Sequence, residues 1–220
     1  MSKQILVVGL TCVDIINYVT SYPAEDSDSR VMKQVWTIGG NAANNVTVLN
    51  QLNSHSILFS AIPMNNPVIT SLLGKVGIST KHCLQRTNCE LPTSTVIVNE
   101  KKATRTIMHY RGKLQEPSLD ELQATFPDIG VFSWIHFEGR NFENLLSMIR
   151  FVYNQRRNQR PKISLECEKV RDFETLEDAI PFADVIFISK DFARFISYRL
   201  GCYKTCFDRL YFHCHVLFRQ

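Results

Sequence analysis

The chain has 220 residues, of which 45% are hydrophobic and 21% charged; this ordinary globular composition excludes disordered, collagen-like and coiled-coil proteins. No apolar run approaches the ~18 residues of a membrane-spanning helix, so no membrane partner is expected. The net charge of +4 is concentrated in residues 198–220, which carry four basic residues and one acidic residue. The rest of the chain is nearly neutral, so nucleic acid is not an expected partner either.

The cysteines indicate a reducing compartment. The chain has seven of them and no Cys-x-x-Cys pair, and the apolar start Gln4–Gly9 is typical of a strand rather than a signal peptide. We therefore expect a cytoplasmic protein with reduced thiols. A late group matches no standard zinc spacing, so we expect no metal site there: Cys202, Cys206, His213, Cys214 and His215.

The first predicted unit is a strand, a glycine turn and a helix. After the strand at Gln4–Gly9, the polar stretch Tyr18–Arg30 is interpreted as a loop or an edge excursion. Val31–Ile38 is a predicted strand that leads into Gly39-Gly40, a pair that allows a tight turn. Asn41 is a good N-cap for a helix that continues to Leu52. Such a helix start presents free backbone N–H groups to a polar ligand.

The middle of the chain predicts short elements and a hairpin. The pattern indicates a strand at Ile57–Ile62 and a helix at Pro67–Val76. Two β-branched runs, Thr95–Val98 and Thr104–His109, are separated by a polar turn, which predicts a hairpin. A further helix is expected at Asp120–Phe126.

The later part alternates strands and helices. Predicted strands begin near residues 134, 163 and 185, with helices at 142–157, at 173–180 and from 191 onward. This βαβ pattern predicts a parallel sheet. His136, Trp36 and Trp134 are interpreted as core or boundary residues.

Polar residues follow several of these strands. In doubly wound sheets, ligands bind beyond the carboxyl ends of the strands. Groups at such ends are candidate ligands or simply polar loop residues: Asp14, Gly39–Asn44, Glu138–Asn141, Glu166, Glu168 and Lys190. The chain contains no Gly-x-x-x-x-Gly-Lys-Ser/Thr, no Gly-x-Gly-x-x-Gly and no Gly-x-Ser-x-Gly.

Several of these segments resemble one known family. Ile5–Leu10, Asp14, Tyr22–Ser27 and Gly39–Asn44 together resemble the ribokinase-like sugar kinases. Trp134–Asn141 and Val185–Asp191 resemble, within that family, the ketohexokinases, which use ATP to phosphorylate fructose on its 1-hydroxyl. The resemblance covers about residues 3–197. It implies an α/β, doubly wound, mostly parallel sheet flanked by helices, with a small β-sheet lid (β-clasp) from segments near 12–36 and 93–111.

The resemblance also implies site residues. Those matching sugar contacts are Asp14, Gly40, Asn41 and Asn44, with Glu138 near the sugar and Asp26 reaching the sugar of a neighbouring subunit. Those matching ATP contacts are Arg105 and Lys190. Magnesium-ATP is the implied co-substrate, and a homodimer through the lid is the implied assembly. No residue is assigned as a metal ligand.

The chain departs from the family pattern in two places. Many relatives carry Asn-x-x-Glu where this sequence has Lys190–Ala193, and the family's late Gly-Ala-Gly-Asp, whose Asp is the catalytic base, does not occur. No catalytic residue is therefore assigned. We expect residues 1–197 to form an incomplete kinase domain with its C-terminal part truncated, and residues 198–220 to be a divergent tail.

The expected function is ATP-dependent phosphorylation of fructose to fructose 1-phosphate, with this chain weakly active or inactive. One alternative is a non-catalytic dimerisation or sugar-binding module derived from such a kinase. Another is a related kinase for a different sugar or for a nucleoside. We also expect the strand that ends at Ser189 to leave an unpaired sheet edge, which the aromatic tail of residues 198–220 would cover only in part.

Overall fold

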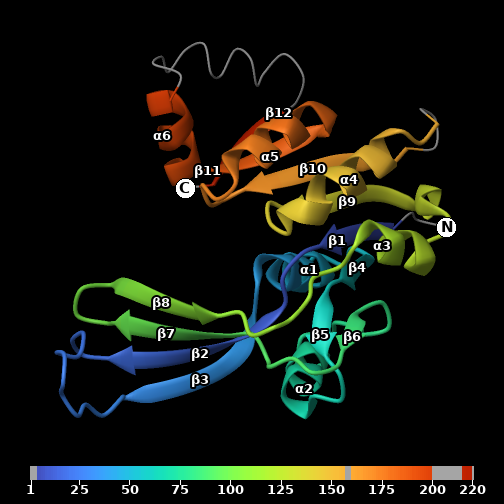
Figure 1. Cartoon of the computed structure of the whole chain (residues 1–220). Coiled ribbons are helices and arrows are strands. Elements are labelled where there is room, and N and C mark those ends of the chain that lie inside the picture. Colours follow the sequence, from blue (N-terminus) through green and yellow to red (C-terminus); the bar gives the residue numbers. More distant parts are fainter. Residues whose placement is uncertain (1–3, 157–159, 200–214, 220) are drawn as a thin grey trace.

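Within residues 4–156, 160–199 and 215–219, which the computed structural model describes, six parallel strands form the central sheet. Their order is β12–β11–β10–β9–β1–β4 (Figure 1). The strands are β1 (Gln4–Val8), β4 (Ser56–Phe59), β9 (Phe132–Glu138), β10 (Lys162–Cys167), β11 (Val185–Ser189) and β12 (His215–Arg219). The parallel pairing and the helices between the strands confirm the predicted α/β fold.

Helices cover both faces of this sheet, because alternate residues of the strands face opposite ways. Leu6 and Val8 of β1 pack into a core with α3–α6, whereas Val7 packs into a second core with α1 and α2. The helices are α1 (Asn41–Gln51), α2 (Pro67–Lys75), α3 (Leu119–Thr125), α4 (Phe142–Tyr153), α5 (Phe173–Ala179) and α6 (Lys190–Arg199). Short 3₁₀ helices lie at Ile129–Val131 and Ile180–Phe182.

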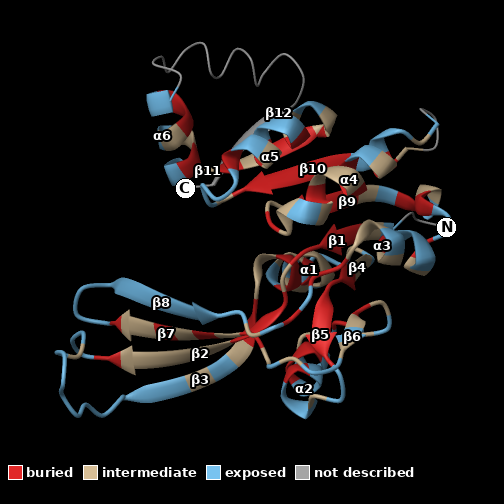
Figure 2. Ribbon diagram, viewed as in Figure 1, coloured by how far each residue is buried: buried red, intermediate tan, exposed pale blue. Residues whose placement is uncertain are grey.

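A separate sheet, here called the lid, projects from this body (Figure 1). In the described part of the chain it has four strands in the order β3–β2–β7–β8. Their bounds are β2 (Cys12–Val19), β3 (Lys33–Gly39), β7 (Thr93–Asn99) and β8 (Thr104–Tyr110). The four strands converge where the lid meets the body, and β8 is exposed along its whole length (Figure 2).

Two local predictions about the lid and the neighbouring strands are wrong. Trp36 was expected in the core or at its boundary, yet it is 48% exposed on β3, because the lid has no layer over it within the described chain. The single strand expected at Ile57–Ile62 breaks at Ser60. β4 joins the central sheet, whereas β5 (Ala61–Pro63) pairs with β6 (Leu84–Arg86) in a small separate sheet.

The edge beyond β11 also differs from the expectation. β12 pairs in parallel with the whole of β11, from Val185 opposite His215 to Ser189 opposite Arg219. The edge of β11 is therefore paired, and the unpaired edge predicted there is wrong. The side chains of the late Cys/His group lie outside the described residues. No helix in the described part of the chain is long and apolar enough to cross a membrane.

Candidate functional site

At the candidate site, the turn between β3 and α1 packs closely against the residues at the start of β2. Gly40 has φ +89, and a Cβ there would lie 2.3 Å from the carbonyl oxygen of Leu10. A Cβ on Gly39 would lie 2.2 Å from Asp14 Oδ1. Only glycine fits at position 40, where the φ is positive and the backbone of Leu10 lies in contact, whereas at position 39 a side chain would displace the Asp14 carboxylate. The Asp14 carboxylate therefore lies against this turn, beside the N-terminus of α1.

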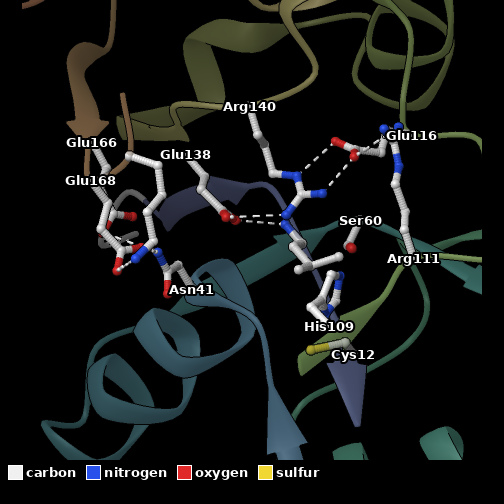
Figure 3. Close-up of polar contacts among 12 residues, drawn as sticks. Cys12, Asn41, Ser60, His109, Arg111, Glu116, Glu138, Arg140, Glu166 and Glu168 are labelled. Carbon is white, nitrogen blue, oxygen red and sulfur yellow. Dashed lines mark hydrogen bonds and ion pairs between the residues drawn. The ribbon is translucent and has the colours of Figure 1, made fainter. Parts of the chain in front are cut away.

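Asn41 has a different role from the predicted one. The N-cap of α1 is Gly40, which makes no side-chain cap hydrogen bond, and Asn41 is the first helical residue. Its Nδ2 donates instead to Glu166 Oε1 at 3.2 Å and to Glu168 Oε2 at 2.5 Å. Asn41 thus links the first turn of α1 to a pair of carboxylates at the end of β10 (Figure 3). The N-cap prediction was wrong because Gly40, with its φ of +89, takes the cap position, so the helix begins at Asn41, one residue earlier than predicted.

The lid places a row of polar side chains beside this turn. Asp14 on β2 lies opposite Ser94 on β7, which lies opposite His109 on β8. Directly opposite residues share a face of a sheet. Ser94 Oγ is 3.1 Å from His109 Nδ1, and Cys12 Sγ donates to Asp14 Oδ1 at 3.6 Å.

The shifted pKa values of Cys12 and His109 favour the neutral form of both side chains at neutral pH. Burial, reinforced by the nearby Asp14 carboxylate, raises the pKa of the Cys12 thiol to about 12, so it stays protonated at neutral pH. Partial desolvation of the ring of His109, which is otherwise exposed on β8, and the Arg140 and Arg171 guanidinium groups lower the pKa of His109. The row therefore offers a carboxylate together with neutral donors and acceptors, which suits a polyhydroxylated ligand.

Behind the row lies a buried group of charges. Glu138, at the end of β9, accepts a hydrogen bond from the Leu10 N–H through Oε2 at 2.7 Å and contacts Arg140 through Oε1 at 3.3 Å. Arg140 also binds both oxygens of Glu116, at 2.7 and 2.9 Å. Burial raises the pKa of Glu138 from 4.5 to about 7, with the Arg140 charge opposing the shift.

This raised pKa predicts a pH dependence of stability. Between about pH 4.5 and 7 the folded chain binds more protons at Glu138 than the unfolded chain, so the free energy of unfolding falls as the pH rises through that window. The loss reaches up to about 3 kcal/mol and then levels off above pH 7. Glu138→Gln retains an acceptor and should abolish this component.

The measurement is urea unfolding of wild type and Glu138→Gln from pH 5 to 8. The difference between the two curves isolates Glu138, because His82 and His109, whose lowered pKa values give the opposite slope, are present in both proteins. Parallel curves at every pH would show that Glu138 does not titrate in this range.

The structure brings some sequence-predicted site residues together and separates others. Asp14, Gly40, Asn41 and Glu138 surround the junction of lid and body, and exposed Asn44 follows on the first turn of α1. Exposed Lys190 begins α6 directly after β11, at the same carboxyl edge of the sheet.

Asp26 and Arg105 lie elsewhere. Asp26 is exposed in the loop between β2 and β3, at the end of the lid far from the body (Figure 1). Arg105 shares the face of Asp14 but aligns through Val98 with Tyr18, four residues further out, which is roughly 13 Å along the strand. Within one chain, neither side chain is part of the group around Asp14.

Two further findings concern metals and histidines. The described residues contain no group of three or more His, Cys, Asp or Glu side chains that could hold a metal ion. Glu166 and Glu168 are two neighbouring carboxylates at the end of β10, and both accept a hydrogen bond from Asn41. His136 is 9% exposed and hydrogen-bonds Ser164 at 2.8 Å, which confirms its interpretation as a core residue.

Sequence reasoning assigned no role to several residues of this site: Cys12, Ser94, His109 and Glu116. Arg140 was only a candidate within Glu138–Asn141, as a ligand or a polar loop residue, and its pairing with Glu116 was not predicted. Glu116 lies 24 positions before Arg140 in an irregular segment. No periodicity connects the two, and only the tertiary fold reveals the pair.

The six-stranded parallel sheet, the glycine turn into α1 and the projecting β-sheet lid are the architecture of the ribokinase-like fold. The chain belongs to the pfkB family of carbohydrate kinases, because the model of that family, "pfkB family carbohydrate kinase", matches residues 2–201. Among curated proteins, it is 32% identical over 203 residues to ketohexokinase of Mus musculus, an alignment that covers 90% of this chain. The chain spans about two thirds (67%) of that relative.

Solved structures share the fold. A ribokinase of Arabidopsis thaliana, complexed with ribose and ATP, matches with a TM-score of 0.71 at 11% identity and covers 99% of this chain and 72% of its own. A nucleoside kinase of Burkholderia thailandensis, in complex with inosine, matches with a TM-score of 0.73 at 12% identity and covers 98% and 70%. At these identities the likeness concerns the fold alone.

Proposed function

We propose that this chain carries the sugar-binding part of an ATP-dependent ketohexokinase, with fructose as the sugar and its 1-hydroxyl as the phosphoryl acceptor. The observation that carries the proposal is the position of the Asp14 carboxylate against the Gly39–Gly40 turn, beside the first turn of α1. A carboxylate, the Gly40 amide and the amide side chains of Asn41 and Asn44 can bind adjacent hydroxyls in a fixed orientation. The likeness to mouse ketohexokinase supports fructose over other sugars.

The proposal for ATP rests on residues at the same sheet edge and on the lid. Lys190 is exposed at the carboxyl end of β11, and Arg105 is exposed on the lid face that carries Asp14. We assign both to the ATP phosphates. Bound magnesium would neutralise charge on the transferring phosphates, and Glu166 and Glu168 are the carboxylates that fit this role.

Assembly and location are proposed on the same basis. Exposed apolar side chains on β3 and β8, among them Trp36, Ile107 and Met108, suit a homodimer formed through the lids. In such a dimer Asp26, at the far end of the lid, would reach the sugar of the neighbouring subunit. We further propose a cytoplasmic location, a kinase domain over residues 1–197 and a divergent tail over 198–220.

A second candidate function follows from one observation about the sequence. The 220 residues include no Gly-Ala-Gly-Asp, the segment that supplies the base in the family this chain resembles. A chain with the sugar site and the lid but no base would be a sugar-binding or dimerisation module. Sugar binding by this chain and phosphorylation by this chain are therefore tested separately.

Isothermal titration of the 220-residue chain with fructose, ribose and inosine tests the proposal. Fructose is expected to bind one per chain, with an affinity in the millimolar range, near −4 kcal/mol, and more tightly than the other two. Tighter binding of ribose or inosine would move the assignment to a different kinase of the same family. Absence of binding by all three would overturn the sugar site.

A further inference from the structure

Five residues form a continuous path of polar contacts at the junction of lid and body, here called the hinge network: Leu10, Arg111, Glu116, Glu138 and Arg140. The Leu10 N–H donates to Glu138, which contacts Arg140. Arg140 binds Glu116 through two hydrogen bonds, and Arg111 reaches the same Glu116 at 3.2 Å. Figure 3 shows Arg140 between the two carboxylates, with Arg111 on the far side of Glu116.

The two ends of the hinge network lie where the chain enters and leaves the lid. Leu10 lies between β1 of the body and β2 of the lid. Arg111 is the first residue after β8, the last lid strand, and Glu116 lies five residues further on, before α3. Glu138 and Arg140 belong to the end of β9 in the body. One charge path therefore connects the first and last lid crossings to the same strand end.

Burial makes loss of the contacts among Glu116, Arg140 and Glu138 energetically costly. The side chains of Glu116, Glu138 and Arg140 are 8%, 10% and 10% exposed. A buried guanidinium that loses one carboxylate partner is strongly destabilised, since water cannot replace the contact. Arg111 is 60% exposed, so its contact with Glu116 is screened and easily exchanged for water. The rigid part of the network is Glu116–Arg140–Glu138.

We propose that Glu116 and Arg140 are positioning residues that fix the lid relative to the body and so set the position of Asp14, on the lid, relative to Asn41 and Asn44 on α1 of the body. They act through the lid crossings, and nothing in the proposal requires them to touch the sugar. The fixed lid angle is inferred from the contacts alone and does not depend on the proposed function. Its consequence for sugar affinity rests on the proposed function, and the two are measured separately below.

Hydrogen–deuterium exchange of the 220-residue chain tests the fixed lid angle. Glu116→Gln leaves Glu138 as the remaining carboxyl partner of Arg140 and is expected to speed amide exchange in β2 and β8 about tenfold or more, because hydrogen bonds to charged groups contribute at least that factor. Exchange in β10 should stay as in wild type. Arg140→Lys, which keeps the charge but not the two parallel hydrogen bonds, should loosen the lid similarly.

The chain contains a matched control. Arg160 and Asp184 form another bidentate pair, at 2.9 Å and 2.9 Å, beside β10 and β11 in the body. Asp184→Asn should speed exchange in β10 and β11 and leave the lid strands unchanged. Arg111→Gln, which removes only the exposed contact, should change lid exchange less than twofold.

Outcomes for the lid and for the sugar are distinguishable. If Glu116→Gln and Arg140→Lys leave lid exchange at the wild-type rate, or accelerate lid and β10 equally, the positioning role is wrong. Should Glu116→Gln fail to fold, the exchange rates of Arg140→Lys decide between these results. In the separate measurement of fructose affinity, Glu116→Gln should weaken fructose binding about two- to thirtyfold. An unchanged affinity with a loosened lid overturns the link to Asp14, whereas a wild-type chain that binds no fructose overturns the proposed function only.

Discussion

The 220-residue chain is expected to phosphorylate fructose no faster than a blank without protein. Loss of a general base alone typically costs about 10²–10⁴-fold, and the glycine amides that stabilise the transferring group in the family's Gly-Ala-Gly-Asp segment are absent from this sequence as well. The measurement is ADP release with fructose and magnesium-ATP, each varied in turn. Mouse ketohexokinase in the same assay serves as the positive control.

Saturable phosphorylation by this chain would contradict the expectation. It would mean that another group supplies the base, and Asp14 and Glu138 would be the carboxylates to test first, since both lie at the junction of lid and body. A phosphorylation rate that rises only after residues bearing Gly-Ala-Gly-Asp are appended would agree with the proposed division of the site.

Asp14→Ala is expected to weaken fructose binding by roughly 10- to 150-fold. The change removes a charged hydrogen-bond acceptor, and such bonds contribute about 1.5–3 kcal/mol. Asn44→Ala should have a smaller effect, roughly 2- to 13-fold, because a neutral amide contributes about 0.5–1.5 kcal/mol. Calorimetric titration with fructose measures both variants.

A matched control shows whether the loss is specific. Asp28→Ala removes an exposed carboxylate from the far loop of the lid and should leave fructose affinity at the wild-type value. ATP affinity should also be unchanged in Asp14→Ala. If fructose binds Asp14→Ala as tightly as wild type, Asp14 is an ordinary polar residue at a strand start and the sugar site has been assigned wrongly.

The fold was largely predictable because its signals are local. Buried parallel strands appear as continuous apolar runs, as in Ile5–Val8, and the helices between them repeat apolar residues at helical spacing. The wrong predictions lie where tertiary contacts, rather than the local sequence, determine the secondary structure. Residues 57–62 form one mostly apolar run and predict one strand. In the structure the run divides at Ser60, because β4 and β5 pair in different sheets.

The candidate site was predictable only in part, and the reason is the same. Asp14, Gly40 and Asn41 stand next to strand ends or a glycine turn, which are positions that the sequence reveals. The partners of Asn41 are carboxylates more than 120 residues away, so its recruitment by Glu166 and Glu168 has no local signal. Glu116 and Arg140 likewise meet only because the lid returns to the body beside β9.

A crystal structure of the 220-residue chain with fructose would show whether the sugar binds at the junction of lid and body, as we propose. Sugar hydroxyls are expected within hydrogen-bond distance, about 2.5–3.2 Å, of the Asp14 carboxylate and of the Asn41 and Asn44 side chains. Fructose bound at any other place, with Asp14 left without a contact to it, would contradict the proposed sugar site.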